Sequence, residues 1–168
     1  MQKKEYETSL YGSTFVAKTH PLIVFRGALD SFGAQIVWVQ TQLETLGGQE
    51  SLIAHLQEIL DMTGEIMGAE VLQKPLEKDS LIGRSFDRLR EESHNPQKYF
   101  AQKALAPPHK DKGPVYALLN VLRATAREVE IKGVRAFLQG EALAREDICK
   151  ALNRLSSALY VLMCESQG

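Results

Sequence analysis

The chain has 168 residues, a formal net charge of −1 and a hydrophobic fraction of 44%. This length is sufficient to bury a core and favours a single domain. A charge so close to neutral gives no basic surface of the kind that binds nucleic acid or membranes, so we expect neither partner. The sequence shows no signal-peptide pattern and no unbroken apolar run of bilayer length, and we therefore expect a cytoplasmic protein.

The first half of the chain predicts two long helices. From Leu22 to Leu46, apolar residues recur at steps of three and four, between Pro21 and the pair Gly47-Gly48. This spacing is typical of an amphipathic helix, and proline and glycine are common at helix starts and ends. A second helix is predicted from a cap at Ser51 to about residue 69.

The second half contains more helix breakers before it becomes regular again. Between residues 70 and 113 we expect one helix near 80–92, a short one near 96–104 and a mobile loop at 105–113. Pro114 then opens a long helix to about Leu138, and a last helix runs from about Arg145 to Glu165. No segment alternates with a period of two, so the prediction is an all-α bundle of four or five helices.

The domain organisation follows from these elements. We predict a helical bundle domain over residues 17–168, preceded by an N-terminal segment of residues 1–16 for which disorder is one outcome. Cys149 and Cys164 fall on one predicted helix, roughly 22 Å apart at a rise of about 1.5 Å per residue, too far for a disulfide. The histidines lack a second ligand at metal spacing, so we expect no metal site; they are His20, His55, His94 and His109.

The helix from residue 114 carries a polar stripe that core packing does not explain. Arg123, Arg127 and Glu130 stand at i, i+4 and i+7, and Asn120 precedes them by three residues. Two arginines at i, i+4 repel each other, so the pair needs a carboxylate from elsewhere or an anionic ligand. A solvated charged face or an ion-pair network within the bundle is the competing interpretation, which the periodicity alone favours.

The last helix carries a second polar stripe. Asn153, Ser157 and Tyr160 share one side of it, whereas residues 158–164 are apolar or aromatic on every side, as in a central helix. Asn153 and Arg154 are therefore expected near buried surface, where polar groups need partners. Arginine presents a planar fork to phosphate oxygens, so a nucleotide is one candidate, although no glycine-rich phosphate loop accompanies these residues.

Three segments in order resemble the ATP:cob(I)alamin (corrinoid) adenosyltransferases: "AKTHPLIVFRGALDS" (17–31), "ALLNVLRATAREVE" (117–130) and "ALNRLSSALYVLM" (151–163). The resemblance covers nearly all of the chain from Lys18 to Met163 and is closest to the ethanolamine-utilisation type. It implies a cobalamin adenosyltransferase-like helical bundle. It also implies transfer of the 5′-deoxyadenosyl group of ATP to the cobalt of cob(I)alamin, giving adenosylcobalamin and triphosphate, with Mg²⁺ on the triphosphate.

The resemblance also implies residue roles. Arg127 and Asn153 are the implied catalytic residues. Arg127, Arg154 and Lys18 would balance triphosphate charge, while Asn153 and Glu130 would orient the nucleotide. The implied ATP site comprises Lys18, Arg123, Arg127, Glu130, Asn153 and Arg154.

A structural ion pair and a corrinoid site follow from the same resemblance. Asp30 matches the family aspartate that pairs with the first arginine, here Arg123, often across a subunit boundary. A local i, i+4 pair with Arg26 is the alternative. Tyr99, Phe100 and Leu105 are the candidates for apolar side chains under the corrin, with ordinary core packing as the alternative. Family members are dimers or trimers, so we expect a homo-oligomer with shared sites, associated with a bacterial microcompartment as one alternative.

The sequence also departs from the family pattern. Residues 1–16 contain no Thr-Gly-Asp-x-Gly segment, and no cysteine precedes Cys149, whereas the ethanolamine type carries a cysteine-rich metal motif upstream. Either an N-terminal part lies outside this sequence or this branch works without it. Glu128 stands where a second arginine is common, and Ser157 agrees with the ethanolamine type. The competing functions are a non-catalytic corrinoid- or nucleotide-binding module and a purely structural helical bundle.

Overall fold

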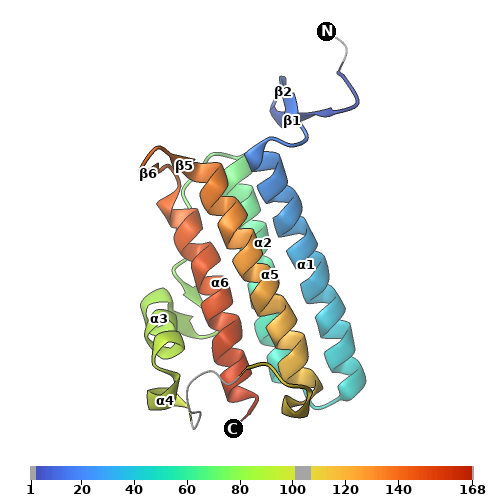
Figure 1. The fold of residues 1–168 in the computed structure, drawn as a ribbon, viewed down its shortest axis with the longest axis vertical. Coiled ribbons are helices and arrows are strands. Elements are labelled where there is room, and N and C mark those ends of the chain that lie inside the picture. The colour runs from blue at the N-terminus through green and yellow to red at the C-terminus, as the bar shows by residue number, and fades with distance from the viewer. Residues whose placement is uncertain (1–2, 101–106, 168) are drawn as a thin grey trace.

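The protein is described by a computed structural model that covers residues 3–100 and 107–167. Within these residues, four long helices lie side by side along the long axis of the molecule (Figure 1). They are α1 (Pro21–Leu46), α2 (Glu50–Val71), α5 (Pro114–Phe137) and α6 (Glu146–Glu165). The predicted all-α helical bundle is confirmed.

The ends of α1 and α2 follow from local chemistry. Pro21 is the first residue of α1, where its missing N–H costs no helical hydrogen bond, and the His20 side chain accepts from the Leu22 N–H. Gly47 and Gly48 both have positive φ and turn the chain within two residues. Because of this tight turn, α2 already begins at Glu50, and the predicted cap at Ser51 is wrong.

Short hairpins occupy places where the sequence predicted none. β1 (Glu7–Tyr11) and β2 (Thr14–Ala17) pair in antiparallel fashion. The Tyr11 hydroxyl donates to Glu70 on α2 and ties the hairpin to the bundle. Another short hairpin, formed by β5 (Leu138–Gln139) and β6 (Ala142–Leu143), connects α5 to α6.

The region between α2 and α5 differs most from the prediction. β3 (Ser80–Leu81) and β4 (Arg84–Ser85) replace the start of the predicted helix at 80–92, because Ile82 and Gly83 have positive φ. α3 (Phe86–His94) then begins where the Ser85 side chain accepts from the Arg88 N–H. α4 (Pro96–Tyr99) ends before an extended Phe100, and a 3₁₀ turn, η1 (Lys110–Lys112), lies in the predicted loop.

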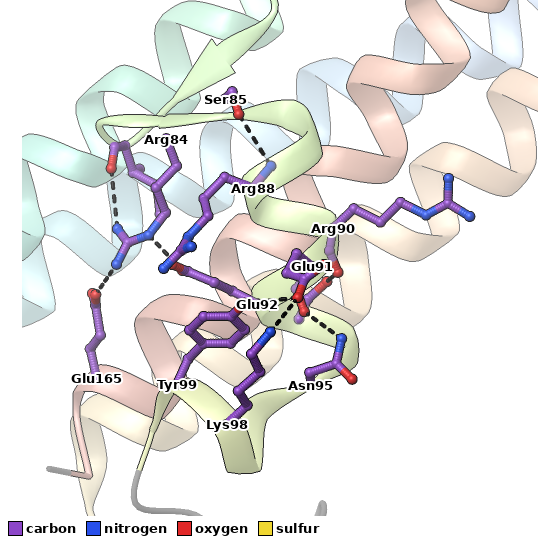
Figure 2. Close-up of polar contacts among 12 residues, drawn as sticks. Arg84, Ser85, Arg88, Arg90, Glu91, Glu92, Asn95, Lys98, Tyr99 and Glu165 are labelled. Atoms are coloured by element: carbon purple, nitrogen blue, oxygen red, sulfur yellow. Dashed lines mark hydrogen bonds and ion pairs between the residues drawn. The ribbon is translucent and has the colours of Figure 1, made fainter.

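A buried carboxylate holds α3 against the end of α6. Glu92 on α3 accepts from Arg84 Nε at 2.7 Å and from Arg88 Nε at 2.6 Å. Arg84 also donates to Glu165, the last residue of α6 (Figure 2). These bonds help to hold α3 beside α6. The helix ends at His94, which lies near residues of both α5 and α6.

The core lies between the four long helices. α1 contributes a regular buried series, Phe25, Leu29, Phe32, Ile36, Val39 and Leu43. At Gly133, α5 passes very close to its neighbours: a Cβ there would lie 2.5 Å from Leu152 Cδ1 and 3.2 Å from Phe25 Cε2. Glycine is therefore the residue that this crossing requires.

The outer face of α1 is also apolar. Val24, Val37 and Trp38 are 41%, 47% and 51% exposed, opposite the buried series. By length and composition α1 could cross a membrane, but a core helix of a soluble protein passes the same test. A helix that is apolar on both sides is usually covered on both sides.

Candidate functional site

The two predicted polar stripes meet at one cleft of about 330 Å³ between α5, α6 and the end of α3. Arg123, Arg127 and Glu130 enter it from α5, and Asn153 enters it from α6. The full lining consists of Ser93, His94, Arg123, Arg127, Glu130, Asn153, Ser156, Ser157 and Tyr160. The structure thus brings four of the six predicted ATP-site residues to one surface and places Arg154 directly behind it.

A chain of hydrogen bonds joins the two helices behind the cleft surface. Asn153 Nδ2 donates to Glu130 Oε1 at 2.6 Å, and Arg154 Nη1 donates to Asn153 Oδ1 at 2.7 Å. The Asn153 amide therefore donates through its NH2 group and accepts through its carbonyl oxygen, and this fixes its orientation. The same hydrogen bonds hold Glu130 and Asn153 in a fixed position relative to each other.

Arg154 is the least satisfied polar residue of the site. Its side chain is 6% exposed, and its buried Nε has no hydrogen-bond partner within the described residues. Burial lowers the pKa of the Arg154 guanidinium, and the positive charge of Arg90 lowers it further, whereas Asp87 and Glu130 act in the opposite direction. A buried cation without a full set of partners reduces stability, which is expected where a residue is kept for a ligand.

The cleft surface carries an excess of positive charge. Arg123 Nε donates only to the neutral Asn120 side chain, at 3.0 Å, and Arg127 is exposed without an ion pair in the part of the chain that the structure describes. Glu130, the acidic residue among the lining, is engaged by Asn153. Two guanidinium groups therefore face one cleft against a single carboxylate, and this excess of positive charge favours an anionic ligand.

Tyr160 lines the same cleft as Arg123. Burial raises the pKa of the Tyr160 hydroxyl, and the neighbouring Cys164 thiol adds to this effect. The hydroxyl is therefore a neutral donor at physiological pH. Together with Ser156 and Ser157 it offers the uncharged hydrogen-bonding groups that a sugar or base edge needs.

Lys18 does not reach the cleft of its own chain. It is exposed after β2, and its backbone N–H donates to Tyr6 O at 2.8 Å. The hairpin lies at the end of the bundle where α5 ends and α1 begins (Figure 1). A role for Lys18 at this cleft would therefore need a second copy of the chain.

Asp30 forms neither of its two predicted pairs within the described chain. It is exposed on α1, away from Arg123. Arg26, the local alternative, instead donates from Nε to the buried Glu70 Oε2 at 2.6 Å and from Nη1 to Leu10 O at 3.0 Å. The buried carboxylate is the stronger partner because it offers two oxygens away from water.

Tyr99 and Phe100, the two predicted corrin-facing residues that the structure describes, are not among the residues that line the cleft. The Tyr99 hydroxyl donates to Glu91 Oε1 at 2.8 Å, and its ring contacts the Arg88 guanidinium, 4.5 Å from the ring centroid (Figure 2). Phe100 packs half-buried against the core. Leu105 lies outside the described residues, and the role of all three in corrinoid binding stays a prediction.

Sequence reasoning missed Ser93 and His94 as cleft residues. They sit at the end of α3, whose position beside α6 depends on the tertiary ion pairs of Glu92, so helical periodicity carried no signal for them. Among residues 3–100 and 107–167 there is no group of three or more His, Cys, Asp or Glu side chains that could hold a metal ion. Burial raises the pKa of Cys149 on α6 to about 11, so this thiol stays protonated.

The amino-acid sequence matches a known family. The sequence profile of the cobalamin adenosyltransferase family matches residues 2–166, and the chain belongs to this family. Among its relatives, the corrinoid adenosyltransferase EutT of Salmonella typhimurium is 37% identical over 164 residues, and the corrinoid adenosyltransferase EutT of Escherichia coli K12 is 37% identical over 163 residues.

These relatives are longer proteins. The alignments cover 97% and 96% of this chain but 59% of each relative. The chain thus corresponds to about three fifths of the length of the curated proteins that it matches.

Proposed function

We propose that the protein transfers the 5′-deoxyadenosyl group of ATP to the cobalt of cob(I)alamin, forming adenosylcobalamin and triphosphate. The observation that carries this proposal is the cleft in which Arg123, Arg127, Glu130 and Asn153 converge, in a chain of the cobalamin adenosyltransferase family. The cationic α5 side suits the triphosphate. The amide, hydroxyl and carboxylate groups suit the adenosine.

The chemistry asks the protein for positioning and charge balance. Cob(I)alamin is itself a strong nucleophile: its cobalt electron pair forms the bond to C5′ while the C5′–O bond breaks and its electrons leave with triphosphate. No catalytic base is needed, so the protein contributes by aligning C5′ with cobalt and stabilising the departing charge. Arg127 and Arg154 would stabilise the triphosphate, with Mg²⁺ bound to its oxygens, while Asn153 and Glu130 would orient the nucleoside.

Corrinoid binding is proposed for Tyr99, Phe100 and Leu105. The 330 Å³ cleft suits a nucleotide, and a corrin needs a larger adjoining surface. Phe100 follows α4 directly and leads into the segment that contains Leu105. The apolar side chains of this segment would contact the corrin and exclude a lower axial ligand from the cobalt.

We further propose that the protein is a homo-oligomer, a dimer or a trimer. The apolar outer face of α1, with Val24, Val37 and Trp38, is a surface that a second copy would cover. Asp30 lies on the same exposed face without an ion pair within the described residues, and Arg123 needs a carboxylate. An Asp30–Arg123 pair between copies would satisfy both, and would allow Lys18 of one copy to reach the cleft of another.

A carrier that binds corrinoid or nucleotide without catalysis is the alternative function. Three measurements separate the candidates: calorimetric titration with MgATP, calorimetric titration with cobalamin, and the spectral conversion of cob(I)alamin to adenosylcobalamin. Binding of both ligands with conversion supports the transferase, and binding without conversion supports the carrier. If neither ligand binds, a structural helical bundle is left and the proposal is wrong.

We propose a cytoplasmic location and a role in ethanolamine utilisation, in association with a bacterial microcompartment. The likeness to proteins named corrinoid adenosyltransferase EutT supports the role. Co-purification of the tagged protein with microcompartment shells from ethanolamine-grown cells tests the association. A purely soluble distribution in those cells would contradict it.

A further inference from the structure

We propose that His94 is a binding residue of the cleft, which holds the anionic part of the ligand through Nε2 when its ring is protonated. The inference rests on the proposed nucleotide-binding function and adds a third wall to that site. His94 ends α3 and lines the cleft opposite α5, the helix that carries Arg123 and Arg127.

The hydrogen bond of His94 fixes which ring nitrogen faces the ligand. Nδ1 lies 2.8 Å from the carbonyl oxygen of Arg90. A carbonyl oxygen only accepts, so Nδ1 must carry the hydrogen, and Nε2 is the nitrogen left for the cleft. In the neutral ring Nε2 can only accept, whereas in the protonated ring it becomes a charged donor. Anion binding through Nε2 therefore requires the protonated form.

The groups on α3 are nearly balanced in charge around this ring. Asp87, Arg90 and Glu91 share a second surface hollow with His94. Glu91 is paired with Lys98 at 2.9 Å, and Arg90 extends away from the ion pairs on the other side of α3 (Figure 2).

The groups across the cleft carry an excess of positive charge. α5 presents Arg123 and Arg127 against the single carboxylate of Glu130, and α6 presents the neutral Tyr160 with Arg154 behind it. A polyphosphate between these walls would reverse the local charge and favour the protonated ring. Ligand binding and proton binding at His94 are therefore coupled, and each strengthens the other.

The experiment compares ATP affinity at pH 6 and pH 8 by calorimetry, with inorganic triphosphate as a second probe. Both probes titrate in this range themselves, so the signal is the difference between the wild-type chain and His94→Asn. Asparagine can keep a donor near the Arg90 carbonyl but has no atom at the position of Nε2. We expect the wild type to lose about five- to tenfold more affinity than His94→Asn between pH 6 and pH 8, the size of one charge-assisted hydrogen bond at an exposed site.

Two further variants sharpen the test. His94→Lys places a permanent positive charge in the cleft and should bind ATP at pH 8 more tightly than the wild type, without the extra pH dependence. His109→Gln removes an exposed histidine on η1 and should keep the wild-type profile. Proton uptake on binding at pH 7, measured in buffers of different ionisation enthalpy, should fall in His94→Asn and stay unchanged in His109→Gln.

The outcomes separate this inference from the function beneath it. If the wild type binds ATP and His94→Asn shows the same affinity and pH dependence, the inference is wrong and the nucleotide site stands. If the wild type binds ATP at neither pH, the proposed function fails and the role of His94 fails with it.

Discussion

Two groups of charged residues, at different levels of the same bundle, differ in how completely they are satisfied. Near the β1–β2 hairpin, buried Glu70 accepts hydrogen bonds from Arg26 and Tyr11, and Asp147 accepts from Arg145 and from the Leu76 N–H. In the cleft, Arg154 keeps a buried Nε without a partner within the described residues, and Arg127 has no carboxylate. The first group is complete within the chain, whereas the second is not.

We propose that this difference separates residues that stabilise the fold from residues that bind the ligand. A completed network contributes to folding, and removal of one member leaves the others unpaired. An incomplete set of cations contributes little to folding and leaves donors for a ligand. The following four predictions test this contrast, beginning with the largest expected effect.

Glu70→Ala should destabilise the fold by about 3 to 5 kcal/mol, because it leaves the partly buried Arg26 guanidinium and the Tyr11 hydroxyl without their acceptor. Urea unfolding followed by circular dichroism measures the change. Glu65→Ala is the matched control on α2: its carboxylate is exposed and lies 3.4 Å from Lys78, so it should cost no more than about 0.5 kcal/mol. Equal losses of unfolding free energy in the two variants would show that the buried network stabilises the fold no more than the exposed ion pair does.

Arg127→Ala should reduce ATP affinity about 100-fold, equivalent to ~2.7 kcal/mol, because a charge-assisted contact to phosphate is lost. Calorimetric titration measures the affinity, and circular dichroism should show unchanged helix content. Arg135→Ala removes an exposed arginine from the same helix, outside the cleft, and should bind ATP normally. An Arg127→Ala variant with wild-type affinity would place the nucleotide elsewhere.

The Asp147 carboxyl should make stability depend on acid pH. The hydrogen bonds from Arg145, and then that from the Leu76 N–H, lower its pKa from the ordinary 3.8 to about 2. Its stabilising effect is complete above about pH 4 and is lost as the pH falls through 2, because the unfolded state then binds the proton more readily. With allowance for solvent screening, Asp147→Asn should cost on the order of 1–2 kcal/mol at pH 7.

The measurement for Asp147 is the free energy of unfolding of wild type and Asp147→Asn at several pH values from 7 to 2. The two curves should approach each other below pH 4. A constant difference in unfolding free energy across this range would mean that the charge of Asp147 does not stabilise the fold.

Arg154→Met should change stability the least, by under about 1 kcal/mol in either direction, although the residue is buried. Methionine fills similar space and removes a buried cation whose Nε lacks a partner, and such replacements are often neutral or stabilising. ATP affinity should nevertheless fall. Thermal unfolding and calorimetry on the same sample test both parts, and a loss of several kcal/mol in stability would assign Arg154 to the fold rather than to the ligand.

The helical bundle and the α5–α6 part of the cleft could be predicted from the sequence because both depend on local periodicity. Buried positions three and four apart define α1, α2, α5 and α6, and the same period places Arg123, Arg127 and Glu130 on one side of α5. Asn153 and Arg154 could be recognised as polar residues shortly before residues 158–164, a part of the same helix that is apolar or aromatic on every side. These features need no knowledge of which helix packs on which.

The wrong or missing predictions concern non-local or very short features. The β3–β4 hairpin depends on positive φ at Ile82, a conformation that β-branched residues rarely adopt and that no sequence pattern signals. His94 enters the cleft because α3 packs beside α6, through its buried Phe86 and Leu89 and through the ion pair of Glu92 with Arg84. The pairing of Arg26 with Glu70 joins residues on different helices, and the local i, i+4 rule instead pointed to Asp30.

The absence of a side chain at Gly133 has a consequence for the alignment of the cleft. Leu152 of α6 occupies the space where a Cβ of residue 133 would lie. The next residue of α6 is Asn153, and its partner Glu130 lies about one turn before Gly133 on α5. The close contact of Leu152 with Gly133 therefore sets how α6 is positioned along α5. This position places Asn153 level with Glu130, so that the hydrogen bond between the two cleft walls can form.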